Sequence, residues 1–133
     1  MPHERDIAAM RDMLRCIEIM LDHVGTHRQE TVEHEQELHD AVLFRFIVLG
    51  EAANRVSDEG REEHPEIPWV LAIKMRNFLI HVYDQVKWEI VWDTLKRDIP
   101  QLEAALRTAL ELPPAPGRSR SGDTPPPGPT GGT

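Results

Sequence analysis

The sequence predicts an all-α protein, an antiparallel helical bundle of about four to five helices. Apolar residues recur at spacings of three and four through most of the first 111 residues, which is the pattern of amphipathic helices. No segment alternates apolar and polar residues for long enough to indicate a strand. A chain of 133 residues has room for one domain with a core of modest size. We therefore expect one bundle domain over residues 1–111.

The individual helices follow from these apolar stripes and from the residues that interrupt them. The first helix ends at Gly25 and carries a stripe formed by Ile7, Met10, Leu14, Ile17, Leu21 and Val24. A second helix is expected over residues 38–56, closed by residues 57–60 and followed by a loop. Pro68 suits the first turn of a third helix, because an N–H has no helical partner there. A fourth helix is expected over residues 86–97, and Pro100 opens a last one.

Residues 112–133 differ in composition from the rest of the chain. They hold seven of the 11 prolines and five of the 8 glycines. Such a segment cannot bury enough apolar surface to offset its chain entropy. We predict a disordered Pro/Gly-rich tail.

The charge balance restricts the partners that the protein can take. Lys and Arg total 15 against 23 Asp and Glu, a net charge of −8 that disfavours a broad surface for non-specific polyanion binding. The acidity lies in residues 1–68, whereas residues 69–100 hold five basic and four acidic side chains. The chain has no apolar run near the ~20 residues that a membrane span needs, its N-terminus is charged, and Cys16 is its only cysteine. We expect a soluble, cytoplasmic protein without a membrane partner.

The densest group of reactive side chains lies in the segment Arg76-Asn77-Phe78-Leu79-Ile80-His81-Val82-Tyr83. An Arg offers a planar fork of donors that suits phosphate, and a His can take and give a proton near neutral pH. A metal-free ribonuclease needs a base for the ribose 2′-hydroxyl, an acid for the leaving 5′-oxygen and positive charge on the phosphorane. The segment contains these groups.

Helix geometry separates the two main groups of this segment. Five residues at 100° each place Arg76 and His81 about 140° apart around a straight helix. Either the helix unwinds near His81, which Val82 and the turn-like Asp84-Gln85 allow, or a second subunit supplies the missing group.

At these residues the sequence resembles the HEPN-domain ribonuclease toxins, and within them the HepT group, whose signature is Arg-x4-His-x-Tyr. The signature positions are Arg76, His81 and Tyr83. The resemblance spans about residues 4–110 and also covers Gly50-Glu51-Ala52, residues 65–69, residues 89–93 and residues 98–100.

The resemblance implies a HEPN-like bundle that works as a homodimer and cleaves RNA such as tRNA or mRNA, with motif residues of both subunits in one cleft. Arg76 and His81 would be catalytic, and Asn77 matches the polar residue that often follows the Arg. The resemblance further implies a toxin–antitoxin pair, in which an MntA-like nucleotidyltransferase antitoxin uses ATP to attach AMP to Tyr83. Adenylates there would place bulk and negative charge near the position of the RNA phosphate.

Two residues of the second predicted helix have structural as well as functional interpretations. Gly50 inside a helix costs about 1 kcal/mol relative to Ala, so we expect it to mark a close helix approach, within the bundle or across a dimer. Glu51 is either an ordinary surface acid or a residue that supports the site.

No metal or cofactor is predicted. The histidines of His34-Glu35-Gln36-Glu37-Leu38-His39 stand five apart, whereas the metalloprotease signature needs four. His23 and His27 do stand four apart, but Gly25 lies between them and no third ligand is near in sequence.

Two other functional classes remain open at this point. The net charge of −8 favours a catalytically silent helical module that docks a nucleotidyltransferase. A purely structural dimeric bundle is the other possibility.

Overall fold

The computed structural model describes residues 3–117, and every regular element in this range is helical. The predicted all-α class is therefore confirmed. None of these helices is long and apolar enough to cross a membrane. In chain order the elements are α1 (His3–Val24), α2 (Gln29–His34), α3 (Gln36–Asn54), α4 (Asp58–Glu63), α5 (Trp69–Val82), the 3₁₀ turn η1 (Tyr83–Gln85), α6 (Trp88–Asp93), the π-helical turn η2 (Thr94–Asp98) and α7 (Ile99–Ala109).

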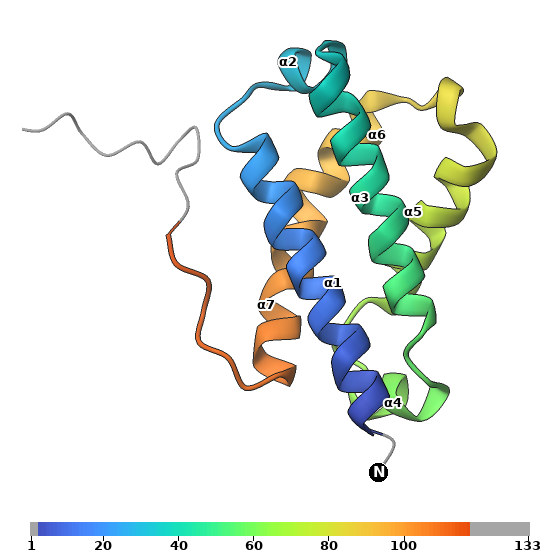
Figure 1. Ribbon diagram of the computed structural model, residues 1–133, viewed down its shortest axis with the longest axis vertical. Coiled ribbons are helices and arrows are strands. Elements are labelled where there is room, and N and C mark those ends of the chain that lie inside the picture. Colours follow the sequence, from blue (N-terminus) through green and yellow to red (C-terminus); the bar gives the residue numbers. More distant parts are fainter. Residues whose placement is uncertain (1–2, 118–133) are drawn as a thin grey trace, which may run out of the picture.

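The helix α3 lies between α1 and α5 and runs antiparallel to both, while α7 lies along α1 (Figure 1). The predicted antiparallel bundle is thus confirmed. Its core takes most of the apolar stripe predicted for α1, whereas Ile7, the first residue of that stripe, is 39% exposed. The methionines Met10, Met13 and Met20 of α1 are buried in this core. Cys16 is a free thiol in the same core, and its Sγ donates a hydrogen bond to the carbonyl of Arg45 at 3.0 Å. Burial raises the pKa of this thiol to about 11.

The connection between α3 and α5 contains a helix where the sequence predicts only a helix end and a loop. The helix α3 ends at Asn54, and Ser57 begins α4 instead of closing α3: its hydroxyl accepts a hydrogen bond from the N–H of Gly60 at 3.0 Å. Ser57 is in turn held by Asp6 of α1, which accepts from its N–H and its hydroxyl at 2.8 and 2.6 Å. A Ser at an N-cap stabilises a helix start, typically by about 1 kcal/mol.

The two last predicted helices form one continuous helical run from α6 through η2 to α7. The helix is not interrupted before Pro100, although the sequence predicts that a new helix begins there. In η2 the backbone changes to the π-helical pattern, in which the N–H of Ile99 donates to the carbonyl of Thr94, five residues earlier. Such a π-turn widens the helix locally. Pro100 fits there, because a proline has no N–H to donate to the helix and its ring crowds the carbonyl four residues earlier.

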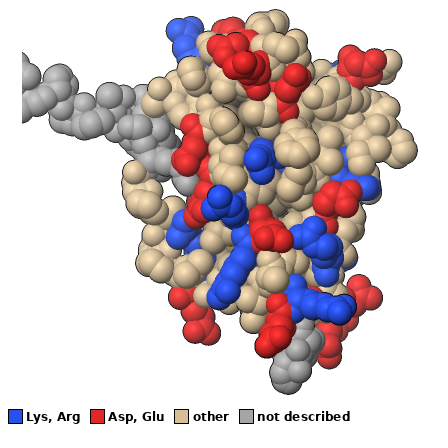
Figure 2. All heavy atoms as spheres, viewed as in Figure 1, with Lys and Arg blue, Asp and Glu red and all other residues tan. Residues whose placement is uncertain are grey.

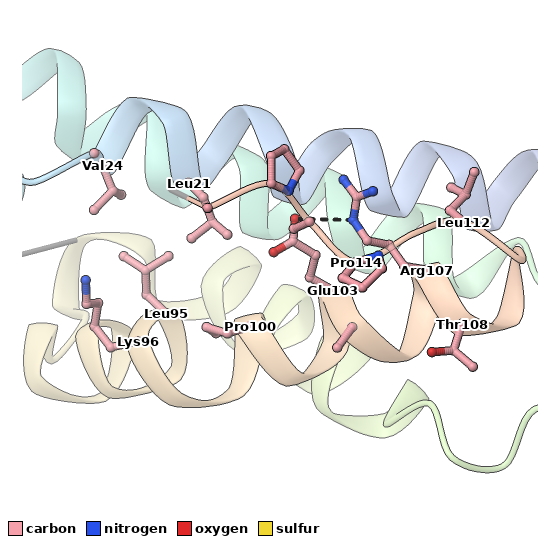
Figure 3. Close-up of a pocket in the computed structure, with 15 residues that line it drawn as sticks. Leu21, Val24, Leu95, Lys96, Pro100, Glu103, Arg107, Thr108, Leu112 and Pro114 are labelled. Atoms are coloured by element: carbon pink, nitrogen blue, oxygen red, sulfur yellow. Dashed lines mark ion pairs between the residues drawn. The ribbon is translucent and has the colours of Figure 1, made fainter. Parts of the chain in front are cut away.

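Residues 112–117 have no regular structure and, with α1, η2 and α7, line a cavity of about 450 Å³ (Figure 3). Arg107 of α7 contacts both α1 and the segment 112–117. Its guanidinium pairs with Glu18 of α1 at 2.5 Å, lies 3.9 Å from Glu103 and donates to the carbonyl of Pro113 at 3.2 Å. The remainder of the predicted disordered tail, residues 118–133, lies outside the described residues.

Candidate active site

The site is built where α3 and α5 approach each other at Gly50. A Cβ added at this glycine would lie 2.1 Å from the Cβ of Arg76 and 2.8 Å from the carbonyl oxygen of Ala72, distances that real Cβ atoms do not show. Only glycine therefore allows the two helices to pack at this separation. The expectation of a close helix approach at Gly50 is met within the bundle.

This close approach brings Glu51 of α3 against Arg76 of α5. The Nε and Nη2 atoms of Arg76 donate to Oε2 of Glu51 at 2.8 and 2.5 Å, and Nη1 donates to Oδ1 of Asn77 at 2.8 Å. The Arg76 side chain is 28% exposed, so the guanidinium is held at the surface without being buried. A guanidinium has five N–H donors, and three are engaged here. The other two have no hydrogen-bond partner among residues 3–117.

His81 lies five residues, about 1.4 turns, further along α5, and its side chain is exposed. Within the described range no hydrogen bond or ion pair links this imidazole to Arg76 or to any other residue. The helix does not unwind before His81: α5 runs to Val82, whose φ of −134° and ψ of 38° leave the helical region one residue later. Arg76 and His81 thus remain about 140° apart around one regular helix.

Tyr83 lies just after this distortion, in the turn η1. Its hydroxyl donates a long hydrogen bond, 3.4 Å, to Oδ1 of Asp40 in the first half of α3. Partial burial, and then the charge and hydrogen bond of Asp40, raise the pKa of Tyr83. Asp40 is absent from the residues singled out in the sequence. Only the antiparallel pairing of α3 with α5 places the start of one beside the end of the other.

Exposed apolar side chains occur on the same two helices. Phe44 of α3 is 55% exposed, and Phe78 and Ile80 of α5 are 38% and 46% exposed. Phe44 stands four residues after Asp40 and seven before Glu51, spacings that put all three on one face of α3.

On the face seen in Figure 2, basic and acidic side chains are interspersed and do not gather into one basic patch.

The structure therefore brings together Arg76, Glu51 and Asn77, and separately Tyr83 and Asp40, while His81 stands alone. Among residues 3–117 no group of three or more His, Cys, Asp or Glu side chains is arranged to hold a metal ion. The arrangement provides an oriented cation and an exposed proton carrier on one helix.

Fold and site define a class: a small helical bundle that carries the sequence Arg-x4-His-x-Tyr at the end of α5, the helix that packs against α3. The model of the HepT-like ribonuclease family, "Ribonuclease HepT-like", matches residues 5–109, and the chain belongs to this family.

Similar proteins are also named as ribonucleases or putative ribonucleases. The chain is 35% identical over 89 residues to "Putative RNase TTE0752" of Caldanaerobacter subterraneus subsp. tengcongensis, a match that covers 63% of this chain and 80% of that one. It is 31% identical over 94 residues to "Probable ribonuclease HepT" of Thermococcus cleftensis, covering 71% and 86%. A match of 29% identity to "Gamma-glutamylcyclotransferase and putative RNase MJ0434" of Methanocaldococcus jannaschii covers 77% of this chain and 46% of that longer protein. No solved structure gives a significant match.

Proposed function

We propose that this chain is the toxin of a toxin–antitoxin pair, a metal-independent endoribonuclease that cleaves tRNA or mRNA in the cytoplasm. The observation that carries the proposal is the oriented guanidinium of Arg76 on the same helix as the exposed His81. Family membership supports the choice of RNA as substrate.

In this mechanism His81 takes the proton of the ribose 2′-hydroxyl, and the 2′-oxygen attacks the adjacent phosphorus. The bond to the 5′-oxygen breaks, an acid protonates that oxygen, and a 2′,3′-cyclic phosphate remains. Arg76 stabilises the negative charge that develops on the phosphorane. Glu51 and Asn77 are positioning residues, because they fix the guanidinium whose remaining donors meet the phosphate.

The mechanism needs a second proton carrier, and a homodimer supplies it as the His81 of a second copy. The divergence of Arg76 and His81 around α5 supports a composite cleft, since one chain does not aim both groups at one phosphate. The exposed apolar side chains of α3 and α5, Phe44, Phe78 and Ile80, provide a surface for such a contact. A two-fold axis would bring two copies of the motif together.

The antitoxin in this proposal is an MntA-like nucleotidyltransferase that attaches AMP to Tyr83. Tyr83 is 39% exposed and lies two residues after His81. Each added AMP brings a phosphodiester charge that repels the RNA backbone. Modification at this position would therefore inhibit cleavage without unfolding the bundle.

The direct test is RNA cleavage by the purified, unmodified chain in EDTA. We expect cleavage to persist in EDTA and the products to end in 2′,3′-cyclic phosphate, because none of the proposed steps uses a metal. Dephosphorylation assays and mass spectrometry of the products identify the ends. Cleavage that stops in EDTA, or products with 3′-hydroxyl ends, would contradict this mechanism.

The catalytically silent docking module remains a second candidate, favoured by the net charge of −8. Expression in a bacterial host separates the two. A toxin inhibits growth when expressed alone and is relieved by co-expression of its nucleotidyltransferase, whereas a docking module has no effect alone.

A further inference from the structure

The hydroxyl of Tyr83 faces a carboxylate from another helix. Tyr83 is the only tyrosine of the chain, and its hydroxyl lies 3.4 Å from Oδ1 of Asp40. Asp84, the acidic neighbour of Tyr83 in sequence, is exposed and has no hydrogen bond to this hydroxyl. In the described part of the chain, Asp40 is thus the one carboxylate that contacts the phenol.

The carboxylate of Asp40 is oriented for this contact. Gln36, one turn earlier in α3, donates its Nε2 to Oδ1 of Asp40 at 2.8 Å. The other oxygen, Oδ2, has no hydrogen-bond or ion-pair partner within residues 3–117, and Asp40 is exposed. The group is therefore both held in place and able to exchange a proton with water.

We infer that Asp40 is the proton acceptor for Tyr83 when this tyrosine is adenylylated, so that the toxin itself contributes a catalytic group to its own inactivation. The inference rests on the proposed function, in which Tyr83 receives AMP from ATP.

The chemistry of AMP transfer requires such an acceptor. The phenol of Tyr83 is neutral near pH 7, because the ordinary pKa of a tyrosine lies near 10, and burial and the charge of Asp40 raise the pKa further. In the transfer, the tyrosine oxygen forms a bond to the α-phosphorus of ATP, and the bond from that phosphorus to the bridging oxygen of the β-phosphate breaks. Pyrophosphate leaves, the phenolic proton passes to Asp40, and Asp40 releases it to water.

The substitution Asp40→Asn tests this role. It keeps a carbonyl oxygen that can accept a hydrogen bond but removes the basic carboxylate. We expect the rate of AMP transfer to Tyr83 by an MntA-like nucleotidyltransferase and ATP to fall by about 10²-fold or more, the lower range for loss of a general base. Mass spectrometry of the intact chain over time gives the rate. The matched control is Glu37→Gln, an exposed acid three residues earlier in α3, which should leave the rate unchanged.

A second measurement reports the contact without any antitoxin. Because the chain has one tyrosine, an ultraviolet titration of phenolate formation follows Tyr83 alone. We expect the pKa of Tyr83 to be lower in Asp40→Asn than in the wild type, since the substitution removes the negative charge beside the hydroxyl.

The outcomes separate the inference from the proposed function. A wild-type chain that is never adenylylated defeats the proposed modification, and the inference with it. If the wild type is adenylylated and Asp40→Asn is modified equally fast, the proposed function stands and Asp40 is not the acceptor. A slow Asp40→Asn variant whose Tyr83 titrates as in the wild type also overturns the inference, because Asp40 then does not contact the phenol in solution.

Discussion

We expect His81→Ala to reduce RNA cleavage by at least about 10²-fold, and by up to about 10⁴-fold where the same imidazole serves as base in one site and acid in another. The expected loss is large because no other proton carrier near neutral pH lies on the exposed part of α5. The fold should be unaffected. His81 is exposed and has no side-chain partner within residues 3–117, so we expect the free energy of unfolding to change by less than about 0.5 kcal/mol.

The measurement is the initial rate of cleavage in EDTA, with the free energy of unfolding taken from urea titration. His23→Ala is the matched control, because His23 is also an exposed histidine of a long helix but lies on α1. It should cleave RNA like the wild type. A His81→Ala chain that is folded and retains wild-type cleavage would remove His81 from the mechanism.

The same variant tests whether two chains share a site. Arg76→Ala is expected to lose cleavage as well, because the phosphorane then lacks its cation. Because each proposed site needs the His81 of both copies, an equal mixture of the wild type and His81→Ala should keep about a quarter of the activity of the same total amount of wild type, since only the quarter of dimers with two wild-type chains is active. A mixture that keeps about half of that activity, after the chains have been shown to exchange, would show that each site needs only one His81.

The main helices and their order can be predicted from the sequence, because apolar residues at helical spacing mark the side of each helix that packs into the core. The stripe from Ile7 to Val24 predicts α1, and a glycine inside a helix predicts the close approach found at Gly50. Glu51 could not be assigned from the sequence, because only the crossing of α3 and α5 brings it onto Arg76.

The features absent from the prediction depend on contacts between distant residues. Ser57 could end one helix or begin another, and the deciding partner is Asp6, which lies 51 residues earlier. Asp40 likewise becomes a candidate site residue only through its hydrogen bond with Tyr83, which lies 43 residues later. The π-turn before Pro100 keeps α6 and α7 continuous, whereas the proline by itself predicts that one helix ends and another begins there. Local signals therefore define the helices, whereas the polar groups of the site depend on tertiary packing.

Gly50→Ala is expected to destabilise the bundle, although the same change usually stabilises an exposed helix by about 1 kcal/mol. The added Cβ would meet the Cβ of Arg76 at 2.1 Å and the backbone oxygen of Ala72 at 2.8 Å. A backbone atom cannot turn away as a flexible side chain can, so α3 and α5 must separate. Such overpacking typically costs 1–3 kcal/mol and occasionally more. The 2.1 Å contact places the cost at the upper end of this range. After the gain of about 1 kcal/mol in helix propensity we expect a net loss of about 2 kcal/mol in the free energy of unfolding, measured by urea titration.

The same separation should also reduce cleavage in the molecules that remain folded. Glu51 follows Gly50 directly, and its carboxylate orients Arg76 across the contact that the added methyl group would open. Cleavage per folded molecule should therefore fall in Gly50→Ala, whereas Gly117→Ala, where an added Cβ meets nothing within 4 Å, should change neither stability nor rate. If Gly50→Ala is as stable as the wild type, the close contact between α3 and α5 does not exist in solution. If it is less stable but cleaves RNA normally once folded, Glu51 does not position Arg76, and the glycine serves packing alone.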